Sequence, residues 1–360
     1  MQGILALEDG TVFTGEAFGN PGDTWGEVVF STGMSGYQEA LTDSSNSGLI
    51  LVMTYPLIGN YGIMKEKSGS NDSFARGIVV SEFCEEPSNW RQRGKIADFL
   101  HKENIFGLAG VDTRALARHL RKVGAKRGVL STDTSDVKAL IQKAVNSPTL
   151  TGQNLALAAA AKGVTTLPGS GRRVALLDFG SAKPIADCLV KRNCEVKIVP
   201  PDIQVADIMS LRPGGVILGN GPGDPTDIPP NILETVRTLA ALTPIMGIGL
   251  GHLLLGLAFG AKTYKMKTGH RGVNHPVKEL ITGRVYITSQ NHGFDLVEDS
   301  LAGLELIITH RNLNDTTIEG IRHAKHPAFS LQYNPEAAPG PKDSEYIFDR
   351  FVELMDKEAR

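Results

Sequence analysis

The sequence is poor in cysteine and has no marked excess of charge of either sign. Its 360 residues include 37 lysines and arginines, 39 aspartates and glutamates, and only three cysteines, Cys84, Cys188 and Cys194. An odd number of irregularly spaced cysteines argues against a disulfide framework and against a structural zinc site. A nearly balanced charge gives no general attraction to nucleic acid or to an anionic membrane. We therefore expect a cytoplasmic protein that recognises its partners through specific sites.

Long apolar runs and a phosphate-binding loop are also missing. No stretch approaches the ~20 apolar residues that cross a bilayer, and the first residues, MQGILALEDGTVF, do not resemble a secretion signal. The pattern G-x-x-x-x-G-K-[ST] does not occur, so any ATP chemistry should belong to another chain. We expect neither a cofactor nor a metal in this chain.

The length and the change in texture along the chain predict two domains, because single cores seldom grow beyond ~250 residues. Residues 1–150 mix short strands with helices, which is typical of an α+β domain. Residues 151–172 end in proline, glycine and serine without apolar periodicity, and we interpret them as a linker. Residues 173–360 then form the second domain.

Two local patterns in the first domain predict particular elements. Asp9 and Gly10 interrupt alternating apolar residues, which indicates a β-hairpin turn. Asp112 is a candidate N-cap for the helix that follows, and Gly124 is a candidate C-cap at its end. Both predictions depend only on short-range chemistry.

The second domain contains apolar, β-rich runs separated by helical windows. They include RVALLDF, EVKIVP, GGVILG, TPIMGIGL, RVYITSQ and AFSLQY, which are typical of strands buried on both faces of a sheet. This predicts a three-layer α/β domain. Ligands in such domains bind at the carboxyl ends of the strands, where this sequence has GNGPGDP, GLGH, QNHGF and YNPEA. We expect these loops to converge on one pocket.

The glycine-rich loop 219–225, GNGPGDP, admits two interpretations. Its glycines would let backbone N–H groups approach a dinucleotide phosphate, but the spacing does not match G-x-G-x-x-G. Pro222 and Pro225 also remove N–H donors that a phosphate would need. By itself, the loop is better explained as a tight turn.

The segment 244–261 has the form of a nucleophile elbow, in which a buried strand turns sharply into an apolar helix. Gly247 and Gly251 occupy the flanking positions, and Gly249 stands at the centre. A working elbow has cysteine or serine there. Glycine supplies no nucleophile, and its freedom at positive φ removes the strain that an L-residue would hold.

The loop 332–341, QYNPEAAPGP, stands where a cysteine nucleophile would find its base and the carboxylate behind it. Glu336 is suited to orient a histidine, but Asn334 occupies the position of the base. An amide cannot take and return a proton near neutral pH. The sequence therefore offers no general base at this position.

Together these motifs resemble the class I glutamine amidotransferases. The stretches that carry the resemblance are NGPGDP, GIGLGH with the following LLLGLAFGAKTYKMKTGHRGVNHPV, SQNHGF and QYNPEAAPGP. More narrowly, the chain is similar to the carbamoyl-phosphate synthetase small subunit, because LEDGTVFTGEAFG, GEVVFSTGMSGYQEALTD, TYPLIGNYG and GVDTRALARHLR resemble its N-terminal domain. The resemblance covers nearly the whole chain and implies a large-subunit partner that binds ATP and its metal ion.

The resemblance implies a glutamine site with a defective triad. Gly249 falls on the nucleophile, Asn334 on the base and Glu336 on the triad carboxylate. Gly221 and Leu250 would offer oxyanion N–H groups, and Leu253 replaces a glutamine that contacts the substrate. The implied substrate-binding positions are Ser45, Gly221, Gly223, Leu250, Leu253, Asn291, Gly293 and Phe294.

Other thiols and imidazoles offer little as replacements for the missing groups. Cys188 and Cys194 fall in or beside regular elements, where cysteine usually behaves as a small hydrophobe, and Cys84 lies in the other domain. We expect His252 and His292 to orient backbone rather than act as bases. His270 and His275 suggest a metal, but no closed ligand set is visible and the family uses that stretch structurally.

Three functions remain open. The first is a working small subunit that hydrolyses glutamine and passes ammonia to the large subunit, for arginine or pyrimidine synthesis. The second, which we favour, is a structural or regulatory subunit without glutaminase activity, because loss of a nucleophile or base costs roughly a millionfold in a well-studied triad protease. The third is a stand-alone glutamine sensor, against which Leu253 counts.

Overall fold

The computed structural model describes residues 1–64 and 75–358. The chain divides into two compact units, Met1–Leu150 and Thr151–Arg360. Each unit has a hydrophobic core of its own.

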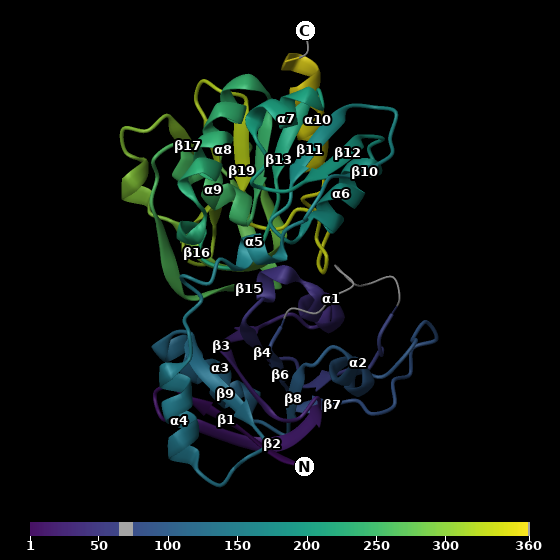
Figure 1. The fold of residues 1–360 in the computed structure, drawn as a ribbon, viewed down its shortest axis with the longest axis vertical. Coiled ribbons are helices and arrows are strands. Elements are labelled where there is room, and N and C mark those ends of the chain that lie inside the picture. The colour runs from purple at the N-terminus through teal and green to yellow at the C-terminus, as the bar shows by residue number, and fades with distance from the viewer. Residues whose placement is uncertain (65–74, 359–360) are drawn as a thin grey trace. The chain divides into compact units, whose positions relative to one another are not determined.

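The strands of the first unit close into a barrel in the order β1-β2-β8-β6-β4-β3-β9 (Figure 1). Neighbours from β3 through β4 and β6 to β8 pair in parallel, and the other pairs are antiparallel. A short parallel pair, β5 with β7, lies outside the barrel. The strands are β1 (Gln2–Leu7), β2 (Val12–Gly19), β3 (Asp23–Ser31), β4 (Leu49–Met53), β5 (Leu57–Ile58), β6 (Gly77–Val79), β7 (Glu82–Phe83), β8 (Phe106–Ala109) and β9 (Lys126–Ser131).

Helices accompany the barrel, which makes the unit α+β as the sequence predicts. They are α1 (Tyr37–Thr42), the 3-10 turn η1 (Ser44–Asn46), α2 (Ile96–Lys102), α3 (Thr113–Val123) and α4 (Val137–Asn146). Successive residues of β1 point to opposite sides: Leu5 and Leu7 pack with α3, whereas Ile4 and Ala6 pack with α4.

Both short-range predictions for this unit are confirmed. β1 and β2 form an antiparallel hairpin, and Gly10 adopts a φ of 90° in its turn. Asp112 caps α3 by accepting a hydrogen bond of 2.8 Å from the N–H of Ala115, and Gly124 follows the helix at a φ of 95°.

The second unit is built on one mixed sheet, in the order β10-β12-β11-β13-β14-β19-β18-β17-β15-β16 (Figure 1). The strands from β12 to β19 run parallel, and antiparallel strands extend the sheet at both ends. They are β10 (Thr165–Leu167), β11 (Arg173–Leu177), β12 (Glu195–Val199), β13 (Gly215–Leu218), β14 (Ile245–Ile248), β15 (Thr263–Glu279), β16 (Val285–Leu296), β17 (Leu306–Asn312), β18 (Ile318–His323) and β19 (Ala328–Leu331).

Helices cover both faces of this sheet, so the predicted three-layer α/β architecture is confirmed. Val174 and Leu176 of β11 pack with α6 and α10, whereas Ala175 and Leu177 pack with α7, α8 and α9. The helical elements are α5 (Leu155–Ala159), α6 (Ala182–Val190), α7 (Val205–Ser210), η2 (Pro225–Asp227), α8 (Pro230–Leu242), α9 (Leu250–Ala258), η3 (Glu298–Leu301) and α10 (Tyr346–Glu358). Across the described residues, no helix has both the length and the apolar character needed to cross a bilayer.

Residues 151–172, expected as a linker, are built into the second unit. They contain α5 and the strand β10, which pairs antiparallel with β12 at the edge of the sheet. Edge pairing needs backbone hydrogen-bonding groups rather than buried apolar side chains, so this strand leaves little trace in the sequence.

Candidate functional site

The strand-turn-helix of the predicted elbow is present at Gly249. The chain leaves β14, turns at Gly249 with φ 58° and ψ −112°, and enters α9. The N–H of Gly249 donates to the carbonyl of Leu331 in β19 over 2.9 Å, which anchors the turn to the sheet. Few L-residues adopt such a backbone conformation without strain, so the elbow geometry is present although residue 249 has no side chain to act as a nucleophile.

The flanking glycines are required by close packing of backbone. A Cβ on Gly247 would lie 2.4 Å from the carbonyl oxygen of Gly251, and a Cβ on Gly251 would lie 2.2 Å from that of Leu218 in β13. Both distances are far below a carbon–oxygen contact. The start of α9 therefore lies directly on the ends of β13 and β14, which places the N–H groups of its first turn at the carboxyl ends of these strands.

Asn220, which belongs to the NGPGDP stretch but has no predicted role there, lies at the centre of this site. Its side-chain Oδ1 accepts hydrogen bonds from the N–H of Gly221 over 2.8 Å and of Leu250 over 3.0 Å. Its Nδ2 donates to Oδ1 of Asn334 over 3.3 Å. All the groups involved are buried or half-buried. Asn220 thus joins the two expected oxyanion amides to the expected base position.

The position of the Asn220 side chain depends on the glycine at 249. A Cβ on Gly249 would lie 2.1 Å from Oδ1 and 2.4 Å from Cγ of Asn220. Any other residue at 249 would therefore displace the amide. The sequence carries no signal of this arrangement, because it depends on a side-chain rotamer opposite a missing Cβ.

Asn334 and Glu336 are held in a buried loop after β19. The N–H of Asn334 donates to the carbonyl of Ser289 over 2.9 Å, which ties the loop to β16. Glu336 is buried, and its charge acts on Cys188. Burial, with Glu336 second, raises the pKa of the Cys188 thiol to about 11, and burial also raises the pKa of Cys194. Neither thiol is suited to replace the missing nucleophile at neutral pH.

Leu253 and Phe294 are packed together in an apolar cluster rather than open to a polar ligand. Both side chains are buried and share this cluster with Leu296, Ile318 and Ile321. A leucine here fills space with methyl groups and offers neither a donor nor an acceptor. Leu253 stands where the resemblance predicts a substrate-binding glutamine. Both its side chain and the surroundings of that side chain are therefore apolar.

The remaining predicted binding positions are spread over three places. Asn291 and Gly293 lie on β16, where Asn291 pairs with Arg271 of β15. Gly223 has a φ of 90° and faces α5, with its hypothetical Cβ 3.3 Å from that of Leu155. Ser45 belongs to η1 of the first unit, where its N–H donates to Asp43 over 2.9 Å. Its role as a glutamine contact stays a prediction.

The histidines nearest these motifs are unsuited to proton transfer. His252 of α9 is fully buried, shares a hydrogen bond of 2.9 Å with the Ser330 hydroxyl, and has its pKa lowered to about 3 by burial. His292 has its pKa lowered well below the usual value, chiefly by burial, and its Nδ1 lies 3.0 Å from the Phe294 carbonyl. His292 thus contacts backbone, as expected of both residues, whereas the partner of His252 is a side-chain hydroxyl.

Comparisons with known proteins account for nearly the whole chain. Residues 5–130 match the family "Carbamoyl-phosphate synthase small chain, CPSase domain", and residues 175–354 match "Glutamine amidotransferase class-I". The carbamoyl phosphate synthase small chain of Listeria monocytogenes serotype 4b is 47% identical over 352 residues, or 98% of this chain and 96% of that protein. The pyrimidine-specific small chain of Bacillus subtilis is 47% identical over 99% of this chain and 96% of its own length. The chain belongs to the carbamoyl-phosphate synthase small chain family.

A solved structure of a putative GMP synthase component from Thermoplasma acidophilum is 21% identical, with a TM-score of 0.45, covering 53% of this chain and 96% of that one. That likeness is too distant to bear on the site. Gly249 and Asn334 both lie within the part of the second unit that matches the amidotransferase family.

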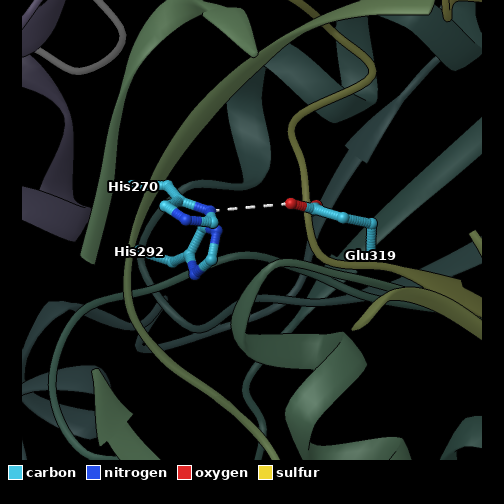
Figure 2. Close-up of side chains that lie close together, drawn as sticks. All are labelled: His270, His292 and Glu319. Carbon is cyan, nitrogen blue, oxygen red and sulfur yellow. Dashed lines mark ion pairs between the residues drawn. The ribbon is translucent and has the colours of Figure 1, made fainter. Parts of the chain in front are cut away.

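A second polar cluster of the small chain lies on the antiparallel strands. Three side chains, those of His270 of β15, His292 of β16 and Glu319 of β18, each have one potential metal-ligand atom, and these atoms lie within 4.8 Å of one another. Figure 2 shows Glu319 pointing at the two imidazoles. The sequence draws attention to each histidine separately but not to Glu319, which no motif marks. Glu319 is fully buried and accepts hydrogen bonds from Gln290 over 2.7 Å and Asn312 over 2.8 Å.

The geometry favours an ion pair over a cation site. Burial alone would lower the pKa of His270, but its hydrogen bond of 2.7 Å with Asp315 and its ion pair with Glu319 at 3.6 Å raise it to about 9. Because a metal ion must displace the proton of an imidazole that ligates it, the raised pKa of His270 opposes metal binding here. The charge of the protonated imidazole instead compensates the buried Glu319, and His275 beside it stays neutral, with a pKa lowered to about 4 by burial and by His270.

This ion pair predicts a loss of stability in weak alkali. The folded-state pKa of His270 lies above its unfolded value of about 6.5, so its contribution is complete below that pH and disappears as pH rises through about 9. We expect the free energy of unfolding to fall by roughly 2–3 kcal/mol over this window. Urea titrations at a series of pH values measure it. Asp315→Asn, which removes one partner, should flatten the decline; an equally steep decline in that variant would contradict the assignment.

Proposed function

We propose that this chain is a small subunit of carbamoyl phosphate synthase that does not hydrolyse glutamine. It binds the large subunit, which it stabilises or regulates, and the large subunit then uses free ammonia. The observation that carries this proposal is the pair Gly249 and Asn334, which leaves the elbow without a nucleophile and its neighbour without a base. The large subunit supplies the ATP site and the metal ion.

Three features of the site support the loss of glutaminase activity. The N–H groups of Gly221 and Leu250, which would stabilise an oxyanion, already donate to Asn220. Cys188 is unsuited to act as the nucleophile instead, because burial raises the pKa of its thiol. Leu253 gives a substrate no polar contact, and an unpaired polar group in a closed site costs ~1–3 kcal/mol.

The alternative of a stand-alone glutamine sensor is less well supported. Asn291, Gly293 and Phe294 stand at positions that hold the amino-acid end of glutamine by resemblance. Phe294, however, packs with Leu253 in an apolar cluster. The two backbone N–H groups that would bind the carboxamide oxygen already donate hydrogen bonds to Asn220. Copurification with a large ATP-dependent subunit would exclude this alternative.

The names of similar small chains indicate which biosynthetic pathway uses the product, and the cysteines indicate the compartment. Two similar small chains, from Bacillus subtilis and Halalkalibacterium halodurans, are named pyrimidine-specific. This favours pyrimidine synthesis over arginine synthesis as the use of the carbamoyl phosphate. The free thiols of Cys84, Cys188 and Cys194 suit the reducing cytoplasm.

The proposal is tested with the chain bound to the large subunit of its own organism. We expect carbamoyl phosphate to form with bicarbonate, ATP and ammonium, and no glutamine-dependent formation above the ammonia present as contaminant. Ammonium and glutamine are compared in one assay, with the isolated large subunit beside the complex. Glutamine-dependent synthesis at an ordinary enzymatic rate would refute the proposal, and so would failure of the two chains to associate.

A further inference from the structure

We infer that the carboxamide site of this subunit is occupied from within, by the side chain of Asn220. The small chain then carries its own amide ligand at the place where a glutamine amide would bind. This deepens the proposed function and rests on it, since it takes the N–H groups of Gly221 and Leu250 as the pair that receives a substrate carbonyl.

The hydrogen bonds of Asn220 are those of a bound primary carboxamide. Its carbonyl oxygen receives both N–H groups, at 2.8 and 3.0 Å, and its NH2 group points at Asn334, with 3.3 Å to the oxygen there. A glutamine presented to an intact triad would place its amide oxygen toward the oxyanion donors and its nitrogen toward the base. Asn220 reproduces both directions with the same functional group.

A purely local explanation accounts for only part of this geometry. The bond to Gly221 joins sequence neighbours and could be made in many asparagine turns. The bond to Leu250 crosses 30 positions and reaches the first residue of α9, and the bond to Asn334 crosses 114. The amide therefore bridges the loop after β13, the start of α9 and the loop after β19, and it is buried at their junction.

The space for this amide exists because residue 249 is glycine. The point at which a nucleophile's Cβ would stand is 2.1 Å from the oxygen and 2.4 Å from the Cγ of Asn220. A catalytic side chain and the inward amide exclude each other. Being tethered, the amide competes with free carboxamides at a high effective concentration, so glutamine is shut out even where other contacts would permit it.

Hydrogen exchange of two backbone amides tests the inference on the full-length chain. In Asn220→Ala the N–H groups of Gly221 and Leu250 lose their acceptor, and we expect their exchange, resolved by NMR, to rise about tenfold or more. Asn334→Ala is the matched control, because it removes only the far end of the contact and should leave both amides protected. Unchanged exchange at both amides in Asn220→Ala would overturn the inference.

Acetamide, a primary carboxamide without an amino-acid end, provides the second arm. It should restore protection of the two amides in Asn220→Ala and leave wild type unaffected. If the alanine variant does not fold, Asn220→Ser, whose hydroxyl is too short to reach Leu250, takes its place. Protection or shifts of these amides by acetamide in wild type would show an empty site and refute the inference. Neither readout depends on glutamine hydrolysis, so the two proposals fail separately.

Discussion

Rebuilding the triad should give this subunit glutaminase activity. In the complex with the large subunit, the variant Gly249→Cys, Leu253→Gln, Asn334→His regains a thiol on the elbow, a base beside it and a polar contact for the substrate. We expect ammonia release from glutamine to exceed that of wild type by roughly a thousandfold or more, because a lost nucleophile or base alone costs about as much as a whole triad. We expect the buried Glu336 to orient the new histidine.

The matched control carries Gly249→Ala with the same two other changes. Alanine introduces the Cβ that displaces the Asn220 amide, but it has no thiol. The control therefore separates the effect of displacing the amide from the effect of adding a nucleophile. We expect the control to stay at the wild-type level. Equal activity of the cysteine and alanine variants, or a wild type as fast as the rebuilt enzyme, would mean that another residue is the nucleophile.

Gly251→Ala should destabilise the second unit severely. Its new Cβ would meet the Leu218 carbonyl oxygen at 2.2 Å, and that carbonyl belongs to β13, which is held between β11 and β14. Neither side can yield without breaking sheet hydrogen bonds. Overpacking usually costs about 1–3 kcal/mol, and we expect a loss of at least about 3 kcal/mol here, measured by urea unfolding.

Gly249→Ala provides the comparison for this experiment. Its Cβ meets the end of the Asn220 side chain, which can rotate, so the main cost is the strained backbone at φ 58° and ψ −112°, roughly 1–3 kcal/mol. The two variants add the same methyl group two residues apart. A smaller loss for Gly251→Ala than for Gly249→Ala would contradict the packing described for the elbow.

Local patterns predicted much of the architecture. The caps at Asp112 and Gly124, and the apolar strands of the second unit, depend on neighbouring residues or on burial of a whole strand, and both leave a mark in the sequence. The strand β10 left none, because an edge strand pairs through its backbone while its side chains remain largely outside the core.

The elbow and the missing triad groups could likewise be predicted, because glycine spacing and residue type carry that information. The roles of Asn220, although it lies in the NGPGDP stretch, and of Glu319 could not be predicted. The role of Asn220 depends on a torsion angle opposite a missing Cβ, and that of Glu319 on strands that meet from distant parts of the chain. A buried carboxylate of this kind has no spacing rule, since its partners His270 and Asn312 come from two other strands.

The closed barrel of the first unit has a consequence for its synthesis. β1 is synthesised well before β9, one of its two partners, which ends at Ser131. Until that residue emerges, the barrel cannot close, and β1 keeps an open edge that can pair with another chain. The growing chain is therefore most prone to aggregation in the interval before β9 has been synthesised. A chaperone would protect the chain most during that interval.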